Sequence, residues 1–178
     1  MRAARSPKYM GYDPIGVSGQ RAMVAELYAE LRPALIRALV ATSGSYRGVE
    51  DAVQEAFVAF LQADYDEIVT PAGWLYRVAA RQLRRQERRG WLTARRLPEA
   101  AASQTALLDQ VVARVDLISV LAGLSSRDRQ LVVAKYYLGL RQDEIAAEFG
   151  IPRGTVSAAI SRSSVRLRRA LSAEAAEA

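Results

Sequence analysis

The chain has 178 residues, which suffices for one domain or two small ones, and 51% of them are hydrophobic, so a packed core is expected. Its 25 Lys and Arg residues outnumber its 19 Asp and Glu residues, and the resulting net charge of +6 favours a polyanionic partner. Because the sequence contains no Cys and no His, disulfides and thiolate metal sites are excluded and the commonest general base is missing.

These absences, together with the lack of a catalytic sequence motif, argue against an enzyme, and no cofactor or metal is expected. No apolar stretch approaches the ~18–20 residues that span a bilayer, and no apolar segment follows the basic start. We therefore expect a cytoplasmic protein without membrane insertion. Only Lys8 and Lys135 are lysines, so nearly all basic residues are Arg. Arginine suits phosphate and guanine binding, although a biased codon usage explains this preference equally well.

The N-terminal half is predicted to form three helices. Several Gly residues and a Pro indicate a mobile tail over 1–20, and a helix is expected over 21–40. The clearest helix is expected over 48–62, where apolar residues recur at i, i+3, i+4 and i+7. Thr70 and Pro71 are a helix start signal and predict a third helix over 72–89. The predicted buried stripe of the second helix consists of Val49, Ala52, Val53, Ala56, Phe57, Phe60 and Leu61.

The apolar periodicity is lost near residue 90 and returns at 107, which predicts two small helical domains. We expect one domain over 21–90, a flexible linker over 91–106 and a second domain over 107–172. Residues 173–178 are expected to be a frayed helix end, with a protease tag as the alternative. No segment alternates between polar and apolar residues as a strand does, so the predicted fold class is all-α.

A helix-turn-helix is predicted near the C-terminus. Gly150 is suited to the left-handed conformation that ends a helix, and Pro152 precedes the next one. Such a turn allows the second helix to enter the major groove, so the motif predicts DNA binding. Helical hairpins with a Gly turn also occur in bundles, but the basic second helix favours DNA. The apolar residues expected to pack between the two helices are Ile145, Ala146, Phe149, Val156 and Ile160.

The helix expected over 72–89 carries arginines on one side. At about 100° per residue, the side opposite to them contains Leu75, Ala79 and Leu83. Aligned guanidinium groups repel one another unless an anion faces them, which favours nucleic acid, with a solvated surface as the alternative. Trp74 and Tyr76 add planar groups that can stack on unpaired bases. The basic set is Arg77, Arg81, Arg84, Arg85 and Arg88.

Taken together, residues 22–171 resemble the sigma factors of the extracytoplasmic-function (ECF) group, within the sigma-70 family. Residues 49–57 are similar to the acidic motif of that family, 74–79 to its Trp-Leu-Tyr-Arg run, and 121–171 to its region 4. The resemblance implies a region 2 domain and a region 4 helix-turn-helix domain. It also implies that core RNA polymerase is the partner, through its flap region and through the coiled coil of its largest subunit. The residues implied for the coiled-coil contact are Asp51, Gln54 and Glu55.

The resemblance further implies promoter DNA as a partner, and an anti-sigma factor as a regulator. The helix that contains 74–79 would help to melt and recognise the −10 element, and the second helix of the helix-turn-helix would bind the −35 element. The residues implied for the −10 region are Trp74, Tyr76, Arg77, Arg81, Arg84, Arg85 and Arg88. Those implied for the −35 element are Arg153, Thr155, Ser157, Ser161, Arg162 and Arg166.

The sequence departs from the family pattern on both of these helices. Where the family has Asn and Asp after its Trp-Leu-Tyr run, this chain has Arg81 and Arg85, or Gln82 and Gln86 if one residue is inserted. The Lys-Ser-Arg that commonly follows Gly-Thr-Val is replaced by Ser-Ala-Ala at 157–159, so two cations are lost. Because each lost phosphate contact lowers affinity and salt dependence, we expect weaker or altered −35 binding.

The hypothesis is therefore an alternative sigma factor that binds core polymerase at the nucleoid and directs promoter-specific transcription initiation. A free-standing helix-turn-helix regulator is an alternative, but it leaves the acidic motif and the arginine helix without a role. A sigma-like adaptor with weak DNA binding is a further alternative, which the altered recognition helix favours.

Overall fold

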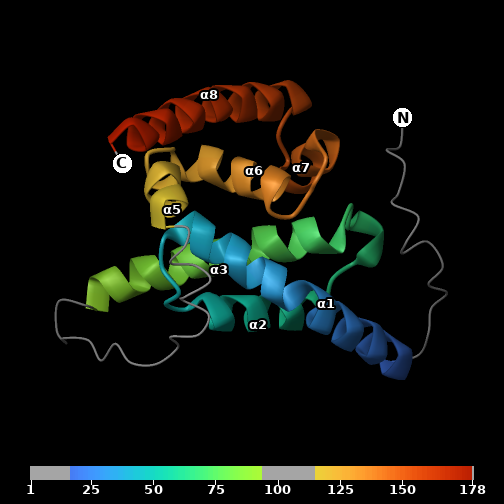
Figure 1. Cartoon of the computed structure of the whole chain (residues 1–178). Helices are drawn as coiled ribbons and strands as arrows, with labels where there is room; N and C mark the ends of the chain where they lie inside the picture. The colour runs from blue at the N-terminus through green and yellow to red at the C-terminus, as the bar shows by residue number, and fades with distance from the viewer. Residues whose placement is uncertain (1–16, 94–114, 178) are drawn as a thin grey trace.

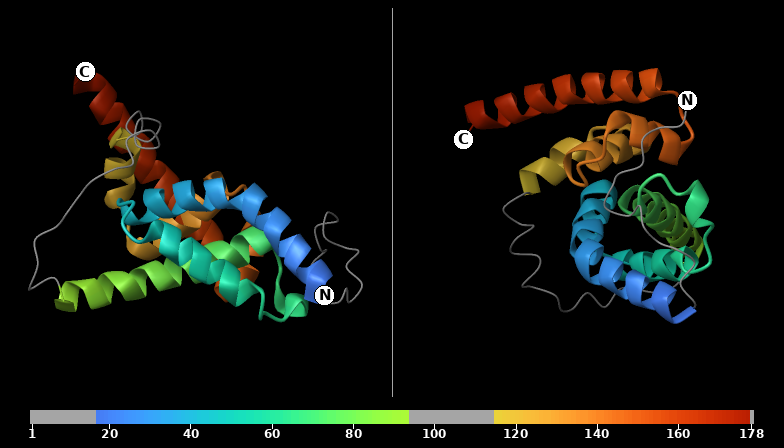
Figure 2. Two further views of the ribbon diagram at one scale, coloured as in Figure 1. Left: turned by 90° about the horizontal axis from the view of Figure 1, so that it is seen from below. Right: turned by 90° about the vertical axis from the view of Figure 1, so that its right-hand side faces the viewer.

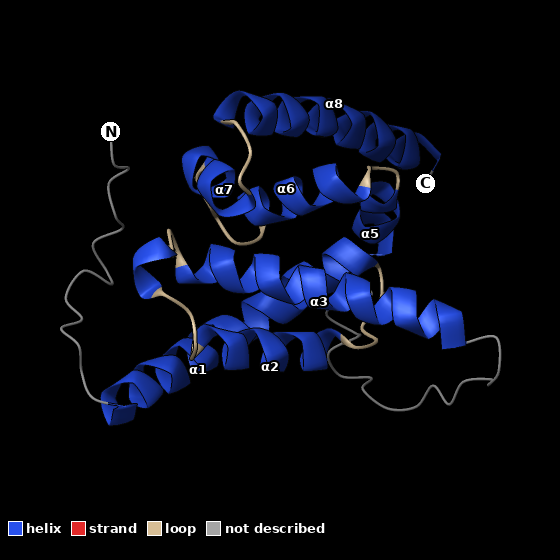
Figure 3. Ribbon diagram, turned by 180° about the vertical axis from the view of Figure 1, so that it is seen from behind, coloured by secondary structure: helices blue, strands red, loops and turns tan. Residues whose placement is uncertain are grey.

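The computed structural model describes residues 17–93 and 115–177. Every regular element within these two ranges is a helix, as the all-α prediction requires (Figure 3). The first range forms an N-terminal domain and the second a C-terminal domain (Figure 1). The N-terminal elements are α1 (Val17–Ser43), α2 (Val49–Phe60), the 3-10 helix η2 (Tyr65–Glu67) and α3 (Pro71–Thr93). The C-terminal elements are α5 (Val115–Ala122), α6 (Ser126–Tyr136), α7 (Gln142–Phe149) and α8 (Arg153–Glu177).

The apolar stripe of α2 lies at the centre of the N-terminal domain, where α2 packs against both α1 and α3. Phe57 meets Tyr28 of α1 with the ring centroids 4.9 Å apart, and Phe60 meets Trp74 of α3 at 5.4 Å. The prediction is wrong for Leu61, which follows the last residue of α2 and is 37% exposed. The predicted stripe residues that are buried are Val49, Ala52, Val53, Ala56, Phe57 and Phe60.

α1 is longer than predicted at both ends. It begins at Val17, so residues 17–20 of the predicted tail are helical, and the remainder of that tail lies outside the described residues. Gln20 ties this first turn to the loop after α2, because its Nε2 donates to the Leu61 carbonyl oxygen and to the Tyr65 hydroxyl, both at 3.0 Å. The helix ends at Ser43, and Gly44 follows with a φ of 78°.

α3 and α8 also extend beyond their predicted ends. α3 continues to Thr93, so the predicted linker begins inside a helix, and its residues 94–106 lie outside the described range. The periodic segment predicted from 107 lies outside it as well, up to 114. α8 continues through most of the predicted frayed end to Glu177, because Ala and Glu favour helix. None of the long helices in the described residues is apolar enough to cross a bilayer.

The two domains share one hydrophobic core in this arrangement. α1 contacts α5 and α6, and α3 contacts α7, so the buried apolar side chains of both domains form a single cluster. From top to bottom of Figure 1 the molecule runs from α8 through α5–α7 to α1 and α3, with α2 farthest from the C-terminal domain. The right-hand view of Figure 2 shows the same order from another direction. α2 and α8 therefore lie at opposite sides of the molecule.

Candidate nucleic-acid and partner interfaces

The side of α2 that faces away from the core is acidic. Asp51, Gln54 and Glu55 are all exposed, and their i, i+3 and i+4 spacing places them on one face of the helix. Asp51 also lies in the first turn, where the helix dipole stabilises an anion. Gln86 of α3 reaches this face, with its Nε2 3.5 Å from Glu55 Oε1. The three residues predicted to bind polymerase therefore form one accessible surface.

Two apolar side chains extend the acidic face of α2. Val58 is 59% exposed and lies seven residues after Asp51, and Leu61 is 37% exposed and lies seven residues after Gln54. Because carboxylates repel phosphates, this mixed acidic and apolar surface fits a protein partner better than nucleic acid. Sequence analysis missed Val58 as a candidate contact, although its spacing from Asp51 is a signal that could have found it.

The basic face of α3 is only partly accessible. Its opposite side is buried as predicted, at Leu75, Ala79 and Leu83. Arg81 and Arg85 are exposed, whereas Arg77 and Arg84 are half-buried. Arg84 lines a cavity of about 120 Å³ between the two domains, opposite Arg129 of α6. The side chain of Arg88 lies outside the described part of the chain. Of the predicted DNA-binding arginines, Arg81 and Arg85 therefore face solvent, whereas Arg77 and Arg84 lie beside the C-terminal domain.

The two aromatic residues near the start of α3 do not face solvent in this arrangement. Tyr76 is completely buried, and its hydroxyl lies 2.6 Å from Thr42 Oγ1 and 3.5 Å from the carbonyl oxygen of Gln130 in α6. Burial raises the pKa of Tyr76 well above its usual value. Trp74 is half-buried against Phe60. The expectation that Tyr76 stacks on bases is thus not met while the domains are packed together.

α7 and α8 form the predicted helix-turn-helix. Gly150 ends α7 with a φ of 62°, and the N–H of Ile151 donates to the Ala146 carbonyl oxygen at 3.0 Å. Val156 and Ile160 pack inward as predicted, with exposures of 0% and 4%. The outer side of α8 faces solvent, and of the predicted residues on it Arg166 donates through Nη2 to the Gly123 carbonyl oxygen at 3.3 Å. The predicted −35 residues on this side are all exposed: Arg153, Thr155, Ser157, Ser161, Arg162 and Arg166.

A shallow depression beside the start of α8 adds further basic groups. Its lining contains three basic residues and one carboxylate: Lys135, Arg141, Gln142, Asp143 and Arg153. Arg141 pairs with Asp143, and the hydrogen bond from Arg141 lowers the pKa of that carboxyl. Helix-turn-helix proteins commonly contact phosphates next to the recognition helix, and this lining has the charge for such a contact.

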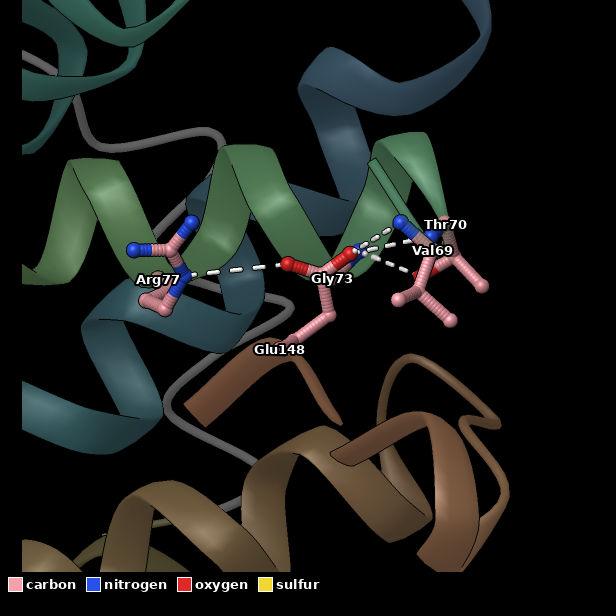
Figure 4. Close-up of polar contacts among 5 residues, drawn as sticks. All are labelled: Val69, Thr70, Gly73, Arg77 and Glu148. Carbon is pink, nitrogen blue, oxygen red and sulfur yellow. Dashed lines mark hydrogen bonds and ion pairs between the residues drawn. The ribbon is translucent and has the colours of Figure 1, made fainter. Parts of the chain in front are cut away.

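Glu148 of α7 joins the two domains at the start of α3 (Figure 4). Its Oε1 accepts hydrogen bonds from the backbone N–H groups of Val69 and Thr70, both at 2.9 Å. Its Oε2 lies 3.7 Å from Nε of Arg77. Glu148 is only 6% exposed, and burial raises its pKa while the N–H groups and Arg77 act in the opposite direction. Sequence analysis missed this residue, because nothing in the local pattern indicates a partner 78 residues away.

Two parts of the chain match models of known families. Residues 27–93 match Sigma-70 region 2, and residues 114–171 match Sigma-70, region 4. The chain belongs to the sigma-70 family. It is an ECF-type sigma factor, with regions 2 and 4 on the N-terminal and C-terminal helices, and such factors direct transcription initiation. Members of this family are in general not enzymes.

Relatives with the same organisation support this assignment. The RNA polymerase sigma factor CnrH of Cupriavidus metallidurans is 28% identical over 173 residues, which cover 88% of this chain and 91% of CnrH. The structure of CnrH in complex with the cytosolic domain of CnrY superposes with a TM-score of 0.65 at 26% identity, covering 88% of this chain and 92% of that one. RpoE of Bartonella quintana, solved with the anti-sigma factor NepR, shares the fold, with a TM-score of 0.61 and 20% identity over 83% and 96% of the two chains.

One of the departures of this sigma factor from the family pattern has a different meaning in the structure. The sequence suggested that two DNA-facing cations are lost within residues 157–159. Ser157 is exposed, but Ala159 is only 3% exposed and packs inward. A long cationic side chain does not fit the position of Ala159 in this packing. Only the replacement at Ser157 therefore removes a charge from the free surface of α8.

Proposed function

We propose that this sigma factor uses three separate surfaces in initiation. The acidic face of α2 binds the coiled coil of the largest polymerase subunit, the basic side of α3 binds the −10 region, and the outer side of α8 binds the −35 element. The C-terminal domain also contacts the flap region of polymerase. The observation that carries the proposal is that the α2 and α8 surfaces are both exposed and lie on opposite sides of the molecule (Figure 1). One chain can thus hold polymerase and DNA at the same time.

The chemistry of each surface supports its assigned partner. The carboxylates at Asp51 and Glu55, together with Val58, offer a protein partner both charge and apolar area. The guanidinium groups of Arg153 and Arg162 can each neutralise a phosphate or bind a guanine edge. Polymerase supplies the chemistry of nucleotide addition, so the chain itself needs no catalytic group and acts at the nucleoid in the bacterial cytoplasm.

An anti-sigma factor is part of this proposal. CnrH and RpoE were both solved with a bound protein, the cytosolic domain of CnrY and the anti-sigma factor NepR respectively. A regulator of the same kind for this chain would have to compete with polymerase or with DNA for one of the three surfaces.

The substitution Asp51→Lys tests the polymerase contact. It reverses the charge at an exposed position in the first turn of α2, at one end of the acidic face, and should weaken binding to sigma-free core polymerase at least about tenfold. Glu26→Lys on α1 makes the same charge change at another exposed position and serves as the matched control. Fluorescence anisotropy of the labelled chain gives both affinities. Equal affinity for the Asp51 variant and the control would remove α2 from the contact.

A further inference from the structure

Glu148 lies against the residues that immediately precede α3, a helix of the other domain. The first N–H groups of a helix have no partner within it, and the helix dipole makes them attractive to an anion. The N–H groups of Val69 and Thr70, which immediately precede α3, donate to Glu148 Oε1, and Arg77 in the second turn of α3 faces Oε2. The carboxylate is thus held by two hydrogen bonds and an ion pair, all across the domain boundary (Figure 4).

Gly73 allows this close approach. A Cβ atom at this position would lie 3.0 Å from Glu148 Cγ and 3.2 Å from Leu140 Cδ1, both in the C-terminal domain. It would also lie 2.6 Å from Thr70 Oγ1, which accepts the N–H of Gly73 at 3.1 Å. A side chain at 73 would therefore force Thr70 to shift and would crowd Glu148 and Leu140 of the C-terminal domain. The short distance between the two helices depends on the glycine as much as on the carboxylate.

A second set of contacts holds the domains together at α1 and α6. Arg129 Nη1 donates to the Thr42 carbonyl oxygen at 2.9 Å, while Nη2 donates to Ala122 and Leu124 within its own domain. The ring of Tyr76 lies against Phe149, with the centroids 6.4 Å apart. These contacts bury Tyr76 and half-bury Arg77, which the proposed function assigns to the −10 region.

The closed arrangement covers only one of the three proposed surfaces. The acidic residues of α2 and the −35 residues of α8 are exposed while the domains are packed together. The start of α3, in contrast, is occupied by Glu148 and covered by α7. Polymerase can therefore bind the closed chain through α2, whereas single-stranded DNA cannot reach the start of α3.

We propose that Glu148 is an autoinhibitory contact. It holds the two residues before α3 and Arg77 from the other domain, and the C-terminal domain must move away before the start of α3 binds DNA. The apparent affinity of α3 for DNA is then the affinity of the open chain multiplied by the fraction of molecules that are open. The role of α3 in DNA binding rests on the proposed function, but the closure by Glu148 does not.

Hydrogen exchange at single amides tests the closure directly on the full chain. The amides of Val69 and Thr70 should exchange slowly in the wild-type chain, although they precede a helix. Glu148→Ala removes their acceptor and should accelerate both at least about tenfold. Glu148→Gln keeps an acceptor oxygen in place and should retain most of the protection. The amide of Trp74, which bonds to the Thr70 carbonyl oxygen within α3, is the internal reference.

A second pair of variants adds a methyl group instead of removing a carboxylate. Gly73→Ala should accelerate the same two amides, whereas Gly154→Ala adds its methyl group to open space and should not. Protection of Val69 and Thr70 that survives both Glu148→Ala and Gly73→Ala would overturn the proposal. Equal acceleration at Trp74 would also overturn it, because Glu148 would then stabilise α3 itself rather than the closed arrangement.

Binding of a fluorescent single-stranded DNA separates this proposal from the proposed function. A 12-nucleotide oligonucleotide of mixed sequence should bind Glu148→Ala several-fold more tightly than Glu148→Gln. If Glu148→Ala loses amide protection but gains no DNA affinity, the conclusion that Glu148 holds the domains closed stands. The DNA-binding role of α3 is then refuted, and the autoinhibition with it.

Discussion

Replacing Tyr76 by Phe removes one hydrogen bond from the junction of α1, α3 and α6. Thr42 donates its hydroxyl proton to the Ala38 carbonyl oxygen at 2.8 Å, so the hydroxyl of Tyr76 is the donor in the 2.6 Å bond to Thr42 Oγ1. The variant keeps the buried ring and leaves no donor without an acceptor. The free energy of unfolding should therefore fall by the value of one hydrogen bond, about 1 kcal/mol.

The effect of pH distinguishes this loss from a packing defect. Because burial raises the pKa of Tyr76, the folded chain keeps the phenolic proton while the unfolded chain releases it near pH ~10. A group with a raised folded pKa contributes stability below the unfolded pKa, and this stability is lost as the pH rises. At about pH 11 the unfolded wild-type chain gains about 1.4 kcal/mol from this ionisation, and the variant gains none. The stability difference should therefore reverse in sign near that pH.

Urea denaturation at pH ~8 and ~11 measures the free energies of unfolding of the wild-type chain and of Tyr76→Phe. At the lower pH, the melting temperature of Tyr76→Phe should be about 2–4 °C below that of the wild-type chain. Tyr136→Phe is the matched control, because Tyr136 is 62% exposed and its hydroxyl makes only a surface contact, 3.3 Å from Ser164 Oγ. The free energy of unfolding of Tyr136→Phe should differ little from that of the wild-type chain at either pH. If Tyr76→Phe lowers the free energy of unfolding by the same amount at both pH values, Tyr76 does not keep a buried phenolic proton in the folded chain.

Three further substitutions test the core, the turn and the DNA surface. Phe57→Ala should cost about 3–5 kcal/mol in denaturation experiments because Phe57 is buried, whereas Val58→Ala next to it should be nearly neutral. Gly150→Ala should cost about 1–2 kcal/mol, since its φ of 62° strains any residue with a Cβ; a neutral result would mean that the turn relaxes. Arg162→Ala should lower the slope of log affinity against log salt for duplex DNA by about 0.9, and Arg37→Ala on α1 should leave it unchanged.

The fold could largely be predicted from the sequence where the signal is local. Three signals depend only on neighbours within a few residues. They are the apolar period of α2, the Thr70-Pro71 pair that starts α3 and the left-handed Gly150 that ends α7. The errors occur at helix ends. The first turn of α1 lies ahead of the predicted start, and there Gln20 bonds to Tyr65, a contact between residues far apart in the chain.

The candidate surfaces could be predicted only in part, for the same reason. Exposure of Asp51 and Arg162 follows from the position of each on an amphipathic helix. The burial of Tyr76 and the role of Glu148 follow from packing of one domain on the other, across 54 and 78 residues of chain. Helical periodicity contains no information about such contacts, so Tyr76 was assigned to DNA and Glu148 to no role.

Transcription from sigma-free core polymerase tests the central claim most directly. The purified chain is added to core polymerase from its own source with fragmented genomic DNA, and the 5′ ends of the transcripts are mapped. The account predicts a discrete set of start sites that share an upstream sequence, and their loss with Asp51→Lys but not with Glu26→Lys. Transcripts that are no more discrete than those of core polymerase alone would contradict it.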